Sequence, residues 1–161
     1  MSTNLLSYEL LLNANNLETL KQLVLNGADI NYQAKNGWCL LFELISLNRH
    51  NELEYFASKN LNIFKKDIKG RTAIFWAIYH NKVESLKVLL KLGCNVNKDV
   101  IPSLSSLHYA VYKNNLSIIK TLLDANVSIN KKDKLEHTAL SYASLYEHKE
   151  TVELLKSHGA L

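Results

Sequence analysis

The sequence predicts an all-α solenoid of about five helix-turn-helix units of 33 residues, joined by short β-turn or hairpin connections. Three observations support this fold class. A helix-stop residue recurs every 33 residues, an apolar helix face precedes each stop, and a shorter helix with a hydroxyl cap opens several units. The 161 residues are 47% hydrophobic and 21% charged, which suits one well-packed domain.

Glycine or asparagine recurs at one position of every repeat. These residues enter the left-handed backbone region at low cost, so they are typical of helix C-termini. The recurring stops are Gly27, Asn60, Gly93, Asn126 and Gly159. Their spacing predicts a single domain over 1–161, without an internal boundary, made of units 1–33, 34–66, 67–99, 100–132 and 133–161.

Two apolar positions three residues apart precede each stop and predict the second helix of each unit, because residues i and i+3 share one helix face. The first position lies seven residues before the stop and holds Leu20, Leu53, Leu86, Ile119 and Val152. The second holds Leu23, Phe56, Leu89, Leu122 and Leu155.

A hydroxyl residue opens a shorter apolar segment in the later units, at Thr72, Ser105 and Thr138. Its side chain is expected to cap the helix by accepting a hydrogen bond from a free backbone N–H. An alanine five residues later lets neighbouring helices approach closely. Each unit is therefore expected to contain two antiparallel helices.

Two segments carry a resemblance to a known family. Ser-Ser-Leu-His-Tyr-Ala at 105–110 and Leu-Asn-Gly-Ala-Asp-Ile-Asn at 25–31, within the 33-residue period, resemble the ankyrin repeat. The resemblance covers essentially the whole chain, although the family's proline after the capping threonine is absent and Phe64 replaces the usual asparagine. It implies that His108 makes a structural hydrogen bond to the backbone of a neighbouring turn.

The resemblance also implies a non-catalytic protein that grips another protein through a concave face, formed by turn tips and by the exposed ends of the first helices. Position within the repeat identifies the expected partner-binding residues as Trp38, Glu43, Leu47, Ile68, Lys69, Arg71, Tyr79, His80, Ile101, Leu104, Tyr112, Lys113, Leu135, His137 and Tyr146. Interfaces are rich in aromatic residues of the kind that this set contains.

Aromatic residues at helical spacing pack in the core or contact a partner, and both roles are expected here. We expect the core role for Trp76, Tyr109 and Tyr142, between units. We expect the exposed role for Trp38, Tyr79, Tyr112 and Tyr146.

Glu43 replaces the aromatic residue that later units carry at the same repeat position. Either it lies half exposed beside Lys69 or Arg71, or it is a polar contact for the partner, and the second interpretation is favoured.

Basic residues gather near the unit junctions, whereas glutamates such as Glu54 and Glu84 fall on second helices, so we expect the fold to separate a basic rim from a more acidic back. We call the basic set the basic rim: Lys35, Lys65, Lys66, Lys69, Arg71, Lys98, Lys131, Lys132 and Lys134. The rim favours a partner with an acidic contact surface. The alternative is that these lysines merely solvate exposed turns.

Other chemistry is poorly supported. The formal charge of +4 is below the usual excess of a nucleic-acid binder, so nucleic-acid binding through the rim and the exposed aromatic residues is kept as the alternative. Cys39 and Cys94 are too far apart for a disulfide framework or a metal motif, so both are expected as reduced thiols. The histidines lack metal-ligand spacing, and no catalytic constellation or phosphate loop is found. No metal, cofactor or small-molecule substrate is expected.

No targeting or membrane-spanning pattern is found, since no apolar run approaches roughly 18 residues. We expect a cytoplasmic monomer, with export by a route that needs no cleavable signal left open. Lys149 and Lys156 replace apolar residues of earlier units, so the last helix is expected to seal the stack of a complete protein. By analogy, a stand-alone inhibitor, immunity or effector-type protein is expected.

Overall fold

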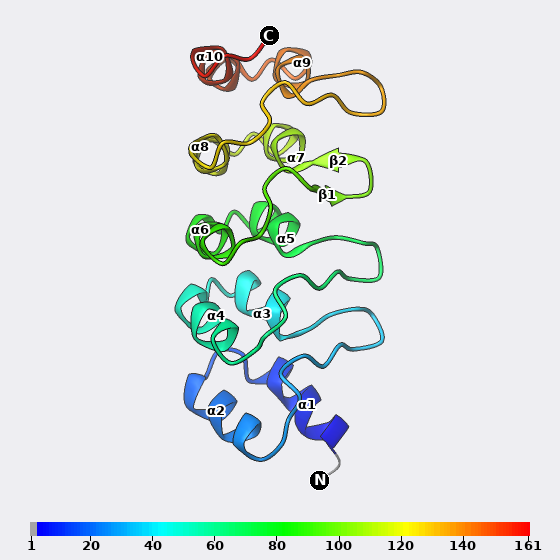
Figure 1. The fold of residues 1–161 in the computed structure, drawn as a ribbon, viewed down its shortest axis with the longest axis vertical. Coiled ribbons are helices and arrows are strands. Elements are labelled where there is room, and N and C mark those ends of the chain that lie inside the picture. The colour runs from blue at the N-terminus through cyan, green and yellow to red at the C-terminus, as the bar shows by residue number, and fades with distance from the viewer. Residues whose placement is uncertain (1–2) are drawn as a thin grey trace.

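Residues 3–161 are described by a computed structural model, which is one stack of helix pairs (Figure 1). The predicted helix-pair solenoid is confirmed, and each of the five predicted units contains two helices. The first helices are α1 (Thr3–Leu12), α3 (Leu40–Ser46), α5 (Ala73–Tyr79), α7 (Ser106–Tyr112) and α9 (Ala139–Leu145). The second helices are α2 (Leu17–Leu25), α4 (His50–Ala57), α6 (Val83–Lys91), α8 (Leu116–Asp124) and α10 (Lys149–Ser157).

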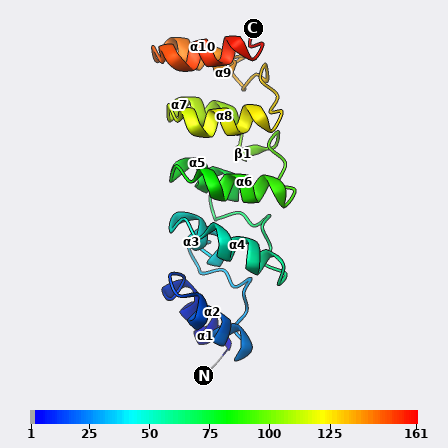
Figure 2. The same cartoon turned by 90° about the vertical axis from the view of Figure 1, so that its left-hand side faces the viewer.

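The helices form two columns with the core between them. First helices lie between the second helices and the loops that project on the right of Figure 1, and Figure 2 shows the column of second helices. The predicted second-helix face is buried in the middle units. Leu23 and Val152 are only half-buried, because within the described residues the first and fifth units each have a neighbour on one side alone.

Residues with a left-handed backbone conformation recur along the stack in three series. The predicted stops end the second helices with φ between 56° and 92°. A second series, not recognised from the sequence, ends the first helices at Asn48, Asn81, Asn114 and Glu147. A third lies in the loop tips at Gly37, Gly70, Ser103 and Glu136. Among the glycines of residues 3–161, Gly37 is also sterically confined, because a Cβ there would lie 2.5 Å from the Ile68 backbone nitrogen.

The predicted hydroxyl caps are present. The side-chain oxygens of Thr72, Ser105 and Thr138 accept hydrogen bonds of 3.3, 3.4 and 3.2 Å from backbone N–H groups three residues later. Cys39 occupies the same repeat position and makes no side-chain cap, so unit two starts its first helix without this support.

The loops between units form short hairpins. Strands β1 (Asp99–Ile101) and β2 (Leu104–Ser105) pair antiparallel, and isolated bridges join Gln33 to Cys39 and Lys132 to Thr138. Pro102 lies at the tip of the β1–β2 hairpin, as predicted for an inter-unit turn.

Asparagine side chains connect successive turns. The Asn31 carboxamide donates to the Asn60 carbonyl and accepts from the Asn62 N–H, at 2.9 and 2.7 Å. Asn130 makes the equivalent pair of bonds with Gly159 and Leu161, and Asn97 accepts from Ser128. We call these contacts the asparagine bridges. Phe64 occupies the second position of the series, between Asn31 and Asn97, and cannot form one.

Candidate functional site

Aromatic rings form a continuous series of contacts from unit two to unit five. We call it the aromatic ladder, and its members are Trp38, Phe75, Trp76, Tyr79, Tyr109, Tyr112, Tyr142 and Tyr146. Three contacts cross unit boundaries: Trp38–Trp76, Phe75–Tyr109 and Tyr112–Tyr146, with ring centroids 4.8, 4.6 and 5.8 Å apart. Such pairs contribute roughly 0.5–1.5 kcal/mol each beyond area burial, so the ladder also stiffens the stack.

Three tyrosines of the ladder are exposed to solvent. Tyr79, Tyr112 and Tyr146 are 47%, 53% and 43% exposed. They lie at the C-terminal ends of α5, α7 and α9, with Tyr146 one repeat position later than the other two. The Lys113 ammonium lies 5.2 Å from the centre of the Tyr79 ring and carries a positive charge onto this surface.

The ladder residues that were expected in the core are buried in units three and four. Trp76 and Tyr109 are buried, as predicted. The predicted core role of Tyr142 holds only in part. Its ring is half-buried and packs against the core and against His108 of the preceding unit, because no later unit within the described residues covers its other side.

Trp38 differs from the expected exposed residue. Its ring is half-buried against Phe42 and Trp76, and its indole N–H donates to a carboxylate oxygen of Glu43. Glu43 is half-buried, and among the described residues no ion pair joins it to Lys69 or Arg71. The Glu43 carboxylate thus serves first as an internal acceptor beside the ladder.

Arg71 is also engaged internally. Its guanidinium forms an ion pair with the buried Asp67 carboxylate and lies 4.3 Å from the centre of the Trp76 ring. The Asp67 carboxylate further accepts the N–H groups of Lys69 and Arg71, so it organises the loop of unit three. Lys69 remains exposed.

The apolar loop positions divide into two groups. Ile68 and Leu135 are highly exposed, as is Leu47 to a smaller extent at the end of α3. Ile101 and Leu104 are half-buried, because the β1–β2 hairpin packs their side chains against the core. Ile68 and Leu135 are therefore the loop residues most open to a partner.

His108 performs the structural role that the resemblance implies. Its ring is buried, Nε2 donates to the His137 carbonyl at 3.0 Å, and Nδ1 lies 2.6 Å from the Ser105 hydroxyl. The bond ties unit four to the loop of unit five, while the His137 side chain stays exposed.

His80 lies beside the ladder, stacked on Trp76 at 5.6 Å between centroids. Burial, and then the nearby Lys82 charge, lower the pKa of His80, while Glu43 opposes this shift. Its Nε2 is buried and has no hydrogen-bond partner within residues 3–161. The ring is therefore favoured in its neutral form.

The expected separation of a basic rim from an acidic back is wrong in part. Acidic residues also lie at the junctions and pair with three rim members: Arg71 with Asp67, Lys131 with Asp99 and Lys132 with Glu136. Within the described residues, the remaining rim lysines have no carboxylate within ion-pair distance: Lys35, Lys65, Lys66, Lys69, Lys98 and Lys134.

Within residues 3–161, no group of three or more His, Cys, Asp or Glu side chains is arranged to hold a metal ion, and both cysteines are free. In the same part of the chain, no helix combines the length and apolar character required to cross a membrane.

The repeated helix pair and the short hairpins between units agree with a comparison against protein families. The family model described as ankyrin repeats (3 copies) matches residues 9–100 and 102–161. The chain belongs to the ankyrin repeat family. Ankyrin repeats are generally protein–protein interaction modules, and ankyrin repeat proteins are typically not enzymes. A comparison with curated proteins gave no match.

Proposed function

We propose that this ankyrin repeat protein binds another protein through the exposed edge of the aromatic ladder, without catalysis. The observation that carries the proposal is the row of exposed rings at successive units, Tyr79, Tyr112 and Tyr146. Large aromatic rings exposed together are uncommon on a surface that contacts only water, and they are enriched in interfaces.

The ladder is also held rigidly, which favours binding. Each exposed tyrosine contacts an aromatic neighbour from its own or an adjoining unit, so a partner meets side chains that are already ordered. Less conformational entropy is then lost on association. Ile68, Leu135, Leu47 and His80 extend the proposed surface around the tyrosines.

We propose that the partner presents acidic groups at this surface. Lys113 lies over Tyr79, and Lys69 is exposed in the loop of unit three. Neither lysine has a carboxylate within ion-pair distance among the described residues. Opposite charges on the partner would speed association and make it sensitive to salt.

Affinity capture from the native source, with the purified protein as bait, tests the proposal and identifies the partner. Y79A and Y112A should each weaken the captured complex by about 30-fold, since losing an interface anchor costs about 2 kcal/mol. Y55A is the matched control, because Tyr55 is exposed on α4, away from the ladder. Equal affinity for all three variants would contradict the proposal.

The same preparations address the remaining expectations. We propose a cytoplasmic monomer that acts as an adaptor or inhibitor by covering a surface of its partner. Sedimentation equilibrium measures the oligomeric state. A gel shift at physiological salt addresses nucleic-acid binding, and a shift abolished by Y79A would assign the ladder to nucleic acid instead.

A further inference from the structure

The replacement of asparagine by Phe64 leaves one unit junction without its bridge. By the period, an asparagine at this position would accept from the Asn95 N–H, as Asn31 accepts from Asn62 and Asn97 from Ser128. Within residues 3–161 no hydrogen bond from the Asn95 N–H is found. The Phe64 ring instead points outward and is 67% exposed.

An apolar cavity of about 160 Å³ lies at this junction. Its lining includes the apolar residues Ile63, Phe64, Ile74 and Val100. Lys66 and Lys98 also line it. An apolar cavity of about 150 Å³ accommodates benzene, so this one has room for a single leucine or phenylalanine side chain. Burial raises the pKa of the Cys94 thiol in the wall to about 11, consistent with an apolar interior.

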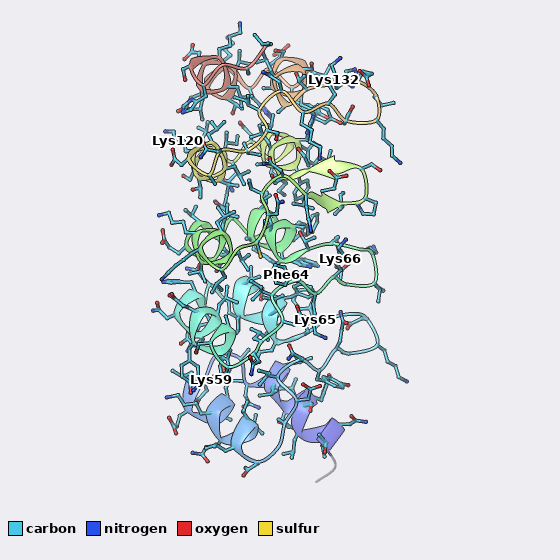
Figure 3. The ribbon with its side chains drawn as sticks, viewed as in Figure 1. Lys59, Phe64, Lys65, Lys66, Lys120 and Lys132 are labelled. Atoms are coloured by element: carbon cyan, nitrogen blue, oxygen red, sulfur yellow. The ribbon has the colours of Figure 1, made fainter. Side chains whose placement is uncertain are left out.

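The charge around the cavity is positive. Lys65, Lys66 and Lys98 have no carboxylate within ion-pair distance in the described part of the chain. Asp99 also lines the cavity, but its carboxylate is paired with Lys131 at 2.7 Å. Figure 3 shows Phe64 beside Lys65 and Lys66 on the side of the stack that faces the viewer.

We propose that this junction binds an extended acidic peptide segment of a partner protein. One apolar side chain of the peptide enters the cavity beside Phe64, and a peptide carbonyl accepts a hydrogen bond from the free Asn95 N–H. Aspartate or glutamate residues on either side of the anchor contact Lys66 and Lys98. A peptide backbone offers the same amide group that asparagine supplies at the other junctions, which favours a peptide over a purely apolar ligand.

This junction is separate from the aromatic ladder. The cavity includes Ala73 at the start of α5, whereas Tyr79 is the last residue of that helix. The inference therefore goes beyond the proposed function. Variants of cavity residues leave the ladder in place, and Y79A leaves the cavity in place.

Titration of the ¹⁵N-labelled protein with the synthetic peptide acetyl-Asp-Glu-Leu-Glu-Asp-amide tests the proposal. The Asn95 and Cys94 amide resonances should shift, and replacing the central leucine of the peptide by alanine should weaken binding at least about tenfold. The double variant K66E K98E should lower affinity, and Y79A should leave it unchanged.

The F64N variant distinguishes a peptide-binding role of this junction from a purely structural one. Asparagine would restore the bridge to Asn95, so the melting temperature should rise by about 2–4 °C while peptide binding is lost. The proposal is overturned if Asn95 does not shift, if F64N binds the peptide as well as the parent does, or if charge reversal at Lys66 and Lys98 has no effect. Shifts confined to Tyr79 and Tyr112 would place the peptide on the ladder instead.

Discussion

The Tyr142 hydroxyl donates a 2.7 Å hydrogen bond to Oδ2 of Asp133. Oδ1 of the same carboxylate accepts the N–H groups of Leu135 and His137, so Asp133 joins α9 to the loop that precedes it. The hydrogen bond from Tyr142 lowers the pKa of Asp133, and the bond to Asp133 raises the pKa of Tyr142 to about 12.

Y142F should destabilise the protein by about 1 kcal/mol at neutral pH, because it removes this bond but keeps the ring. Because the pKa of Asp133 is lowered, its carboxylate adds stability that is complete above the ordinary aspartate pKa. This stability is lost as pH falls through the lowered pKa. The raised pKa of Tyr142 adds stability that is complete below pH about 10 and is lost as pH rises towards 12. Urea midpoints across pH should show a smaller alkaline loss for Y142F than for Y55F.

E147N should stabilise the protein. Glu147 has a φ of 57°, and the equivalent positions of three earlier units hold asparagine, which tolerates this region better than glutamate. We expect a gain of about 0.5–1 kcal/mol in the free energy of unfolding. E147A is the control, because alanine removes the charge but keeps the strain. A gain as large in E147A would attribute the effect to charge.

H108F should cost about 2 kcal/mol, because the bonds to Ser105 and to the His137 carbonyl are both lost inside the stack. H137A should have little effect, since only the His137 backbone accepts the bond. Urea denaturation followed by circular dichroism measures both variants. Equal losses would show that the His137 side chain, and not its carbonyl, supports the junction.

E43Q should lower the pKa of His80 further, because the Glu43 charge raises that pKa against the effect of burial. K82M should raise it, since Lys82 acts in the opposite direction. NMR titration of the His80 ring checks both. Neutral His80 contributes stability that is complete above its ordinary pKa and is lost as pH falls through the lowered value. E43Q should therefore extend this loss to lower pH and make it larger, because only the folded-state pKa changes.

The repeat period predicted the fold because each unit places the same residue types at the same bends. Gly27 and Asn60 are recognisable in isolation, since few residues adopt their backbone conformation cheaply. The left-handed residues that end the first helices were not predicted, because Glu147 interrupts the run of asparagines at this repeat position. The predicted buried face of the second helices is correct in the middle units, where Leu53 and Leu86 have neighbouring units on both sides.

The candidate site was less predictable, because it depends on contacts between units. The half-burial of Trp38 follows from the Trp76 ring and the Glu43 carboxylate, which the fold brings to it. The pairing of Lys131 with Asp99 likewise joins residues one repeat apart. Position within a repeat predicts which way a side chain points, but not what the next unit places beside it.

The contact between Trp38 and Trp76 gives the molecule an intrinsic optical probe of one half. These are its two tryptophans, and both lie at the junction of the second and third units. Their fluorescence therefore follows melting of that half, whereas loss of α9 and α10 alone would leave the emission spectrum nearly unchanged. Comparing emission with the far-ultraviolet helix signal would reveal whether the array melts from its C-terminal end or all at once.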